Sequence, residues 1–289
     1  MYKHVSGTLH LVIFLLLLIL FGTISSSFYF IKSEPGATSV GTFIPTPTPI
    51  APPTVAPIPE KGWTLLQPGL ERRTDSIYNS QNQLVESLHI WRLDQKYFRL
   101  DVAYASTPKS LDAWQRETNA LIVLNGGFYS IDNERYFPDG LTIVAGQASG
   151  HSFNGYGGML AIKESSAQLR WLVQEPYNSS EPLLAALQSF PILVKPGGAL
   201  GFGAERENNV SARRTVIGQD KAGRILFMVA PQGYFTLHQL SVYLMNSNLN
   251  LDVAINLDGG GSTGILVANP REVIAPSRPI PFVILVYPQ

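Results

Sequence analysis

The proline-rich stretch from residue 33 to residue 60 limits what this chain can fold into. It includes Pro45-Thr46-Pro47-Thr48-Pro49 and Pro52-Pro53, carries hardly any charge, and otherwise consists largely of Thr, Ala and Val. Such a sequence forms a semi-extended tether and cannot build a packed core. We therefore predict that residues 33–60 are a linker and that residues 61–289 form one folded domain.

An apolar segment between Lys3 and Lys32 precedes the tether. The run from Leu11 to Phe21 is almost wholly aliphatic, and Phe28-Tyr29-Phe30-Ile31 prolongs it. The total approaches the roughly 20 residues that span a bilayer, with aromatic residues placed as at a membrane interface. We predict that residues 1–32 are an uncleaved signal-anchor transmembrane segment.

The charges beside this segment predict its orientation. Positive residues lie on its N-terminal side, which favours an N-terminus in the cytoplasm. The predicted location is the cell membrane, crossed once, with the folded domain outside the cytoplasm. If Ser25-Ser26-Ser27 served as a cleavage site, the domain would instead be secreted.

Charge and cysteine content exclude several classes of protein. Lys plus Arg and Asp plus Glu both total 21, and no basic run is longer than two residues, so a nucleic-acid partner is not expected. The absence of cysteine excludes disulfides, thiolate metal sites and a cysteine nucleophile. No cofactor or metal is predicted, because Asp258 with Asn256 or Asp139 offers too few oxygen ligands for calcium.

Strand-like and helix-like patterns alternate through the folded region. The segments 88–93 and 97–102 predict a hairpin. Helices are predicted at 110–118, with Ser110 as N-cap, and at 236–246. Further strands are predicted at 120–124, 141–145, 159–163, 192–195, 215–219, 225–230, 253–257 and 265–267. This alternation predicts an α+β fold, a single domain with a mixed β-sheet and flanking helices.

A first glycine motif, Asn125-Gly126-Gly127-Phe128-Tyr129, directly follows the strand predicted at 120–124. Paired glycines permit positive φ and close backbone approach, so either a tight turn or a ligand would require them. The amide of Asn125 both donates and accepts, which suits sugar hydroxyls, although asparagine also stabilises turns. We take Asn125, Gly126, Gly127 and Phe128 as candidate substrate-binding residues.

A second motif, Asn256-Leu257-Asp258-Gly259-Gly260-Gly261-Ser262-Thr263-Gly264, follows the strand predicted at 253–257. Its glycines expose a run of backbone N–H groups of the kind that forms an anion-binding nest. The candidates here are Asn256 and Asp258 for catalysis and Gly259, Gly260, Gly261, Ser262 and Thr263 for substrate binding. No Gly-Lys-Ser/Thr follows, so this is not a nucleotide-binding loop.

The same motif also matches G-x-S-x-G between Gly260 and Gly264, the pattern of a serine-hydrolase elbow. That elbow requires a helix after the serine, whereas Ile265-Leu266-Val267 predicts a strand. It also requires a later histidine, and the last histidine of the chain is His238. We therefore exclude Ser262 as a nucleophile.

A third motif, Arg213-Arg214-Thr215-Val216-Ile217-Gly218, places two cations at the start of an apolar strand. An arginine there could clamp a phosphate or carboxylate with its planar guanidinium, or could be an ordinary solvated strand edge. Arg214 and Thr215 are the candidates that this motif supplies.

Together these segments resemble the phosphodiester glycosidase family over roughly residues 120–267. The matching blocks are 124–128, 140–143, 190–194, 213–218 and 256–263. One departure is Pro231-Gln232-Gly233, where members of the family often carry Asp-Gly. The lack of cysteine-rich additions indicates a bacterial-type member.

The resemblance implies an α+β fold and cleavage of a sugar linked through its anomeric oxygen to phosphate. A phosphate leaving group is already a weak base, so one carboxylate with cationic stabilisation would suffice where ordinary glycosidases use two. Arg214 and the backbone of 259–261 would hold the phosphate, and Asn125 and Asn256 would orient sugar hydroxyls. Asp258 would act as nucleophile, base or oxocarbenium stabiliser.

Two other functions remain open from the sequence. A non-catalytic module that binds glycan or wall polymer would be served equally well by the tether. A glycosidase acting on peptidoglycan or an exopolysaccharide would keep the enzyme class and change the substrate. In every case the expected partners are a carbohydrate or sugar-phosphate and, through residues 1–32, a membrane.

Overall fold

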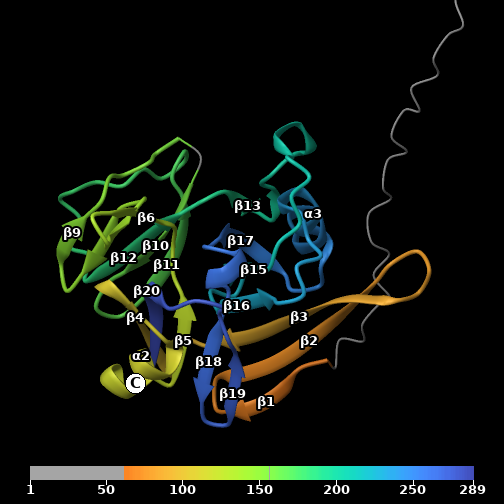
Figure 1. Ribbon diagram of the computed structural model, residues 1–289, viewed down its shortest axis with the longest axis horizontal. Coiled ribbons are helices and arrows are strands. Elements are labelled where there is room, and N and C mark those ends of the chain that lie inside the picture. The colour runs from red at the N-terminus through yellow and green to blue at the C-terminus, as the bar shows by residue number, and fades with distance from the viewer. Residues whose placement is uncertain (1–61, 156) are drawn as a thin grey trace, which may run out of the picture. The chain divides into compact units, whose positions relative to one another are not determined.

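The structure is a computed structural model that describes residues 62–155 and 157–289. The predicted membrane segment, residues 1–32, and the predicted linker, residues 33–60, lie outside the described residues. Within the described part of the chain, no helix is long and apolar enough to cross a membrane. Figure 1 shows that this part consists mainly of strands, with α2 and α3 as its α-helices.

The large sheet has the strand order β1-β2-β3-β16-β15-β17-β13-β14. Its strands are β1 (Thr64–Gln67), β2 (Leu70–Tyr78), β3 (Leu84–Leu93), β13 (Ile192–Lys195), β14 (Ala199–Leu200), β15 (Arg214–Asp220), β16 (Ile225–Ala230) and β17 (Leu251–Asn256). Both faces of its central strands are covered. In β16, for example, Ile225, Phe227 and Val229 pack on one side, and Leu226, Met228 and Ala230 on the other.

Two five-stranded sheets and a two-stranded hairpin accompany the large sheet. The middle sheet has the order β11-β10-β12-β8-β9 and comprises β8 (Thr142–Val144), β9 (Gln147–Ser149), β10 (Gly158–Ile162), β11 (Ala167–Trp171) and β12 (Ala185–Ser189). The C-terminal sheet has the order β19-β18-β5-β20-β4 and comprises β4 (Phe98–Lys109), β5 (Ile122–Asn125), β18 (Ile265–Ala268), β19 (Arg271–Ile274) and β20 (Ile280–Pro288). The hairpin pairs β6 (Tyr129–Asp132) with β7 (Arg135–Pro138).

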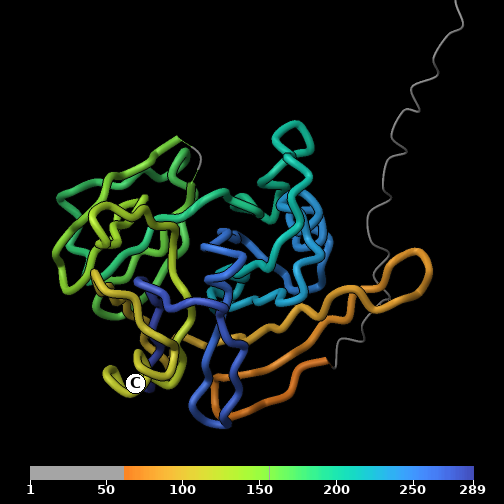
Figure 2. Tube along the Cα trace, viewed as in Figure 1, coloured from red at the N-terminus to blue at the C-terminus, as the bar shows by residue number. Residues whose placement is uncertain are grey.

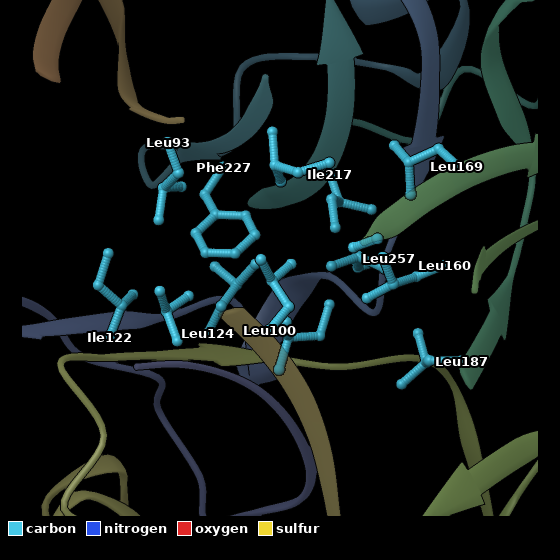
Figure 3. Packing of buried hydrophobic residues seen from close by; sticks show 14 of the residues in the cluster. Leu93, Leu100, Ile122, Leu124, Leu160, Leu169, Leu187, Ile217, Phe227 and Leu257 are labelled. Atoms are coloured by element: carbon cyan, nitrogen blue, oxygen red, sulfur yellow. The ribbon is translucent and has the colours of Figure 1, made fainter. Parts of the chain in front are cut away.

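One hydrophobic core joins the three sheets. It contains Phe227 and Ile217 of the large sheet, Leu160 of the middle sheet, and Ile122 and Leu124 of the C-terminal sheet, all almost fully buried. Figure 3 shows these side chains converging from the three sheets. The burial of so much apolar surface is the main stabilisation of the fold, and it fixes the strand ends that carry the glycine motifs.

The two helices cover outer faces of the sheets. The helix α3 (Leu237–Asn246) packs against the large sheet and begins with a capping box, in which Thr236 and Gln239 each accept the other's backbone N–H. The helix α2 (Leu111–Thr118) packs against the C-terminal sheet, and Ser110 caps it through the N–H of Ala113. Both helices were predicted from the sequence, and both predictions are confirmed.

The predicted α+β fold with a mixed sheet and flanking helices is wrong. The described residues form a mostly β structure in which the strand pairs are antiparallel, and most strands are joined by turns and loops. Several strands lacked a recognisable pattern. In β2, the charged residues Arg73 and Asp75 are buried as an ion pair, and Tyr243 of α3 donates to Asp75 at 2.7 Å.

The predicted hairpin of 88–93 with 97–102 is also wrong. The strand β3 pairs with β2 and β16, whereas β4 pairs with β20, so the two segments enter different sheets. Figure 2 shows the consequence: the yellow chain of β4 and β5 lies beside the blue C-terminal strands. Alternating residues predicted the strands correctly, but long-range pairing decided their partners.

Candidate functional site

The first turn (residues 125–128) and the second turn (residues 256–264) meet where β5 and β17 end. The backbone N–H of Asp258 donates to the carbonyl oxygen of Gly126 at 3.1 Å. Two motifs that lie 133 residues apart in sequence, measured from Asn125 to Asp258, therefore form one hydrogen-bonded unit.

The side chain of Asn125 bonds the two turns together. Its Nδ2 donates to the carbonyl oxygen of Asp258 at 2.8 Å and to that of Gly126 at 3.4 Å. Its Oδ1 accepts from the Thr215 hydroxyl at 2.8 Å and from the Gly264 N–H at 3.0 Å. Asn125 is only 1% exposed, so its amide is fully used inside the protein. The geometry gives it a positioning role rather than contact with a sugar.

Asp258 is the acidic residue of the second turn, and the pKa of its carboxylate is shifted. Burial raises its pKa above the ordinary value of 3.8, and nearby Asp139 acts in the same direction. The Ser262 hydroxyl, the Gly259 N–H at 2.8 Å and the cation of Arg278 oppose this rise. A partly buried carboxylate with a shifted pKa beside charged groups is typical of a catalytic acid or base.

Asp139 is held near Asp258 by the first turn. Its N–H donates to the carbonyl oxygen of Phe128 at 3.0 Å, while the Asp258 N–H uses Gly126 in the same turn. Two acidic residues from distant parts of the chain are thus held by backbone hydrogen bonds to carbonyl oxygens of the same short segment. The sequence had suggested Asp139 only as a poor metal ligand.

Close backbone approach explains two of the predicted glycines. A Cβ on Gly126 would lie 2.9 Å from the Cβ of Phe282, and a Cβ on Gly259 would lie 2.8 Å from the carbonyl oxygen of Arg213. Gly260 has a φ of +56°, which favours glycine. Gly126 and Gly259 are therefore required by the packing of the turns, and Gly260 is favoured by its backbone conformation, independently of any ligand.

The predicted nest of N–H groups is largely used within the protein. The N–H of Gly259 donates to the Asp258 carboxylate, and the N–H of Gly260 donates to the carbonyl oxygen of Arg213 at 2.8 Å. Within the described residues, the N–H of Gly261 has no hydrogen-bond acceptor. One of three candidate donors is therefore available to an anion.

Arg214 points away from the two turns. Its guanidinium donates to the carbonyl oxygens of Phe235 at 3.2 Å and Val210 at 2.7 Å, and burial lowers its pKa. Thr215, the next residue of β15, turns its hydroxyl toward Asn125 instead. Because successive residues of a strand face opposite sides, Arg214 lies on the α3 side of the sheet. The structure does not bring it to Asp258.

Arg213 contacts the second turn in its place. Its Nη2 donates to the carbonyl oxygens of Thr263 at 3.1 Å and Ala275 at 2.9 Å. It therefore connects the second turn to the chain that follows β19. The sequence motif contained the right pair of arginines but did not reveal which one faced the glycines.

Several buried polar atoms of this region lack a protein partner. Among the described residues, three such atoms lie on the second turn: Asn256 Oδ1, Ser262 Oγ and Thr263 Oγ1. A fourth is Nε of Arg213, the arginine that contacts this turn. The Ser262 hydroxyl lies beside the Asp258 carboxylate without completing a regular hydrogen bond. Buried polar groups are normally paired, so this cluster indicates a place for a polar ligand or water.

Aromatic rings line the region next to the first turn. Phe128 stacks on Phe190 with ring centroids 4.6 Å apart, and Phe153 meets Phe190 edge-on at 6.3 Å. A Cβ on Gly127 would lie 3.0 Å from the carbonyl oxygen of Gln188, so this glycine also permits close packing. Phe128 is the last residue of the first turn and is half-buried.

The segment Pro231-Gln232-Gly233, where the family often carries Asp-Gly, is held by another carboxylate. Glu86 of β3 accepts the N–H groups of Gln232 at 3.1 Å, Gly233 at 3.0 Å and Tyr234 at 3.2 Å. Burial nevertheless raises the pKa of Glu86. A structural carboxylate thus orders this loop from a neighbouring strand.

Two further expectations concern nucleophiles and metals. The strand predicted after Ser262 is confirmed as β18, so the turn lacks the helix of a serine-hydrolase elbow. Among residues 62–155 and 157–289, no group of three or more His, Asp or Glu side chains is arranged to hold a metal ion.

Comparison with known proteins assigns the chain to a family. Residues 118–287, more than half of the chain, match the phosphodiester glycosidase family. The chain belongs to the phosphodiester glycosidase family. The resemblance predicted from the motifs is confirmed, and the protein is an enzyme that acts as a glycosidase on phosphodiester-linked sugars. No curated protein matches the sequence.

Solved structures share the fold. The catalytic domain of zebrafish N-acetylglucosamine-1-phosphodiester alpha-N-acetylglucosaminidase, auto-inhibited by pro-peptide, is 17% identical with a TM-score of 0.61 and covers 77% of this chain and 85% of its own. A hypothetical protein from Synechocystis is 12% identical with a TM-score of 0.52, covering 77% of this chain and 63% of its own. A protein from Burkholderia pseudomallei described as exported is 12% identical with a TM-score of 0.51, covering 70% and 74%.

Replacing Asn125 by Asp tests the positioning role. The new carboxylate oxygen would face the carbonyl oxygens of Asp258 and Gly126, so we expect the free energy of unfolding to fall by about 3 kcal/mol or more. Urea unfolding followed by tryptophan fluorescence measures this change. Asn178→Asp is the matched control, because exposed Asn178 uses only its side-chain oxygen, which accepts from Ser180. Equal stability of the two variants would contradict the role.

Proposed function

We propose that this glycosidase hydrolyses the bond between an anomeric sugar carbon and a phosphodiester in a cell-surface glycan, outside the cytoplasm. Family membership supports the reaction class. The single structural observation that carries the proposal is the position of Asp258, a partly buried carboxylate with a raised pKa beside unpartnered buried polar atoms. A carboxylate with a perturbed pKa beside unpaired polar atoms is typical of a catalytic site.

The chemistry requires one bond to break and one to form. The bond between C1 of the sugar and the bridging oxygen breaks, and its electron pair passes to the phosphodiester oxygen. Water supplies the hydroxyl on C1, and its proton passes to a base. Asp258 serves in its ionised form, either as the nucleophile or as the base for water, and Asp139 is the second carboxylate within its electrostatic reach.

The predicted catalytic roles change in one respect. Asp258 keeps its role, and Asn256 remains at the end of β17 with Nδ2 donating to the carbonyl oxygen of Phe190 at 3.0 Å. The unpartnered Oδ1 of Asn256 suits a sugar hydroxyl. Arg214 is not part of this reaction scheme, because its guanidinium already donates to two carbonyl oxygens on the α3 side.

Replacing Asp258 by Asn tests the catalytic assignment. Asparagine keeps an oxygen for the Gly259 N–H, so the fold should remain, while turnover of a sugar-1-phosphodiester should fall about a thousandfold. Asp252→Asn on β17, the strand that precedes Asp258, is the control, because the Asp252 carboxylate accepts the Gly197 N–H and belongs to neither turn. Near-normal activity of Asp258→Asn, with the released sugar quantified, would rule out its role.

The substrate is tested with a panel. Sugar phosphodiesters, teichoic-acid-like polymers, peptidoglycan and an exopolysaccharide are incubated with the wild-type chain, and the products are analysed by mass spectrometry. Release of reducing sugar from a phosphodiester, absent with Asp258→Asn, is the expected outcome. Release from peptidoglycan or exopolysaccharide alone would contradict the proposed substrate class.

The pH dependence of kcat/KM tests the ionised form of Asp258. Since burial and Asp139 raise its pKa, the rate should fall on the acid side at a pH above 3.8. Asp139→Asn removes a neighbouring negative charge and should move this limb to lower pH. Arg278→Gln removes a neighbouring positive charge and should move it to higher pH. If the acid limbs of the two variants' pH profiles do not move in opposite directions, Asp258 is not the titrating group.

The location outside the cytoplasm is supported by the apolar segment 11–31 and the proline-rich stretch 33–60 of the sequence. Protease added to intact cells should digest the domain while leaving a cytoplasmic marker intact. Fractionation then distinguishes an anchored chain, which stays with membranes, from a cleaved one, which enters the medium. Protection of the domain in intact cells would contradict the proposal.

A further inference from the structure

The segment between β19 and β20, residues 275–279, is fastened to the second turn. The guanidinium of Arg213 donates to the carbonyl oxygen of Ala275 at 2.9 Å, and the N–H of Ser277 donates to the carbonyl oxygen of Gly261 at 2.9 Å. A Cβ on Gly264 would lie 2.6 Å from Cδ of Pro276, which shows how closely the two pieces of chain pack. Arg278 is thereby held in a defined place beside the turn.

The guanidinium of Arg278 lies on the backbone of Gly261. A Cβ at Gly261 would be 2.5 Å from Nε, 2.7 Å from Nη2 and 2.9 Å from Cζ of Arg278. Gly261 does not have a left-handed φ, so its lack of a side chain matters for space and not for backbone conformation. Any larger residue here would displace the guanidinium.

The donors of Arg278 are available. Its side chain is exposed, and within the described residues it has neither a hydrogen bond nor an ion pair. It also borders a groove of about 240 Å³ that is lined by residues 110–112, Val273 and residues 275–279 and by no residue of the second turn, so Arg278 is open to solvent. The other arginines nearby are engaged: Arg213 with carbonyl oxygens of the turns, and Arg271 with Asp112 at 2.8 Å.

We propose that Arg278 and the backbone N–H of Gly261 form an anion subsite that binds the phosphate of the substrate. This rests on the proposed function and gives it the cation that Arg214 does not supply. The guanidinium and the backbone N–H are both hydrogen-bond donors to phosphate oxygens, and hydrogen bonds from a charged donor to an anion are stronger than neutral ones. As the bond between C1 and oxygen breaks, the negative charge that develops on the phosphodiester oxygen is stabilised by these donors.

The subsite is tested with Arg278→Gln, Gly261→Ala and the control Arg271→Gln, all in the purified full-length chain. At a pH on the plateau of the rate profile, kcat/KM is measured for a sugar-1-phosphodiester and for a neutral nitrophenyl glycoside of the same sugar. Arg278→Gln and Gly261→Ala should lower the value for the phosphodiester about tenfold or more, and lower the value for the neutral substrate by clearly less, because only the phosphodiester carries a negative charge before the bond breaks. Arg271→Gln should change neither.

Direct binding separates this inference from the proposed reaction. Inorganic phosphate is titrated into the wild-type chain and each variant by isothermal calorimetry, which needs no turnover. Binding to wild type that weakens about tenfold in Arg278→Gln and is retained in Arg271→Gln supports the subsite, even if no phosphodiester is hydrolysed. Equal phosphate affinity of wild type and Arg278→Gln, or no binding to wild type, would overturn it. Circular dichroism melting confirms that the variants are folded.

Discussion

The amide of Asn125 is the interaction on which the site depends. Its oxygen accepts hydrogen bonds from the hydroxyl of Thr215 in the large sheet and from the N–H of Gly264. Its nitrogen donates to carbonyl oxygens of both turns. Because these groups are buried, or partly buried at Asp258, each would be costly to leave unpaired. One side chain therefore fixes the end of β5 in the C-terminal sheet against the large sheet. The same hydrogen bonds set the position of Asp258.

The electrostatics of the site divide between groups that build it and groups that remain free. The Nη2 of Arg213 donates to two carbonyl oxygens, and the N–H groups of Gly259 and Gly260 are used within the protein. What remains is an acid whose pKa is raised by burial and an exposed cation that partly offsets this shift. A site that must expel a phosphodiester needs this pairing of a carboxylate and a cation, because the leaving group requires charge stabilisation more than a proton.

The fold shows why a local pattern misleads in an antiparallel protein. Charged residues within β2 are paired inside the structure, so that strand carries no apolar alternation. The adjacent segments β3 and β4 resemble a hairpin in sequence, but β3 pairs with β2 and β16, and β4 pairs with β20. Local periodicity reports which residues are buried, whereas the choice among antiparallel partners depends on the whole core.

The sequence by itself determined the local elements and the family: both capped helices, the buried strands that end at Asn125 and Asn256, and the glycine turns after them. These follow from caps, apolar runs and glycines, which act over a few residues. Only the tertiary structure decided the sheet partners, turned Arg214 away, and brought Asp139 and Arg278 to Asp258. Neither residue belongs to a recognisable motif: Asp139 is placed by the hydrogen bond of its N–H to Phe128, and Arg278 by the attachment of residues 275–279 to the second turn.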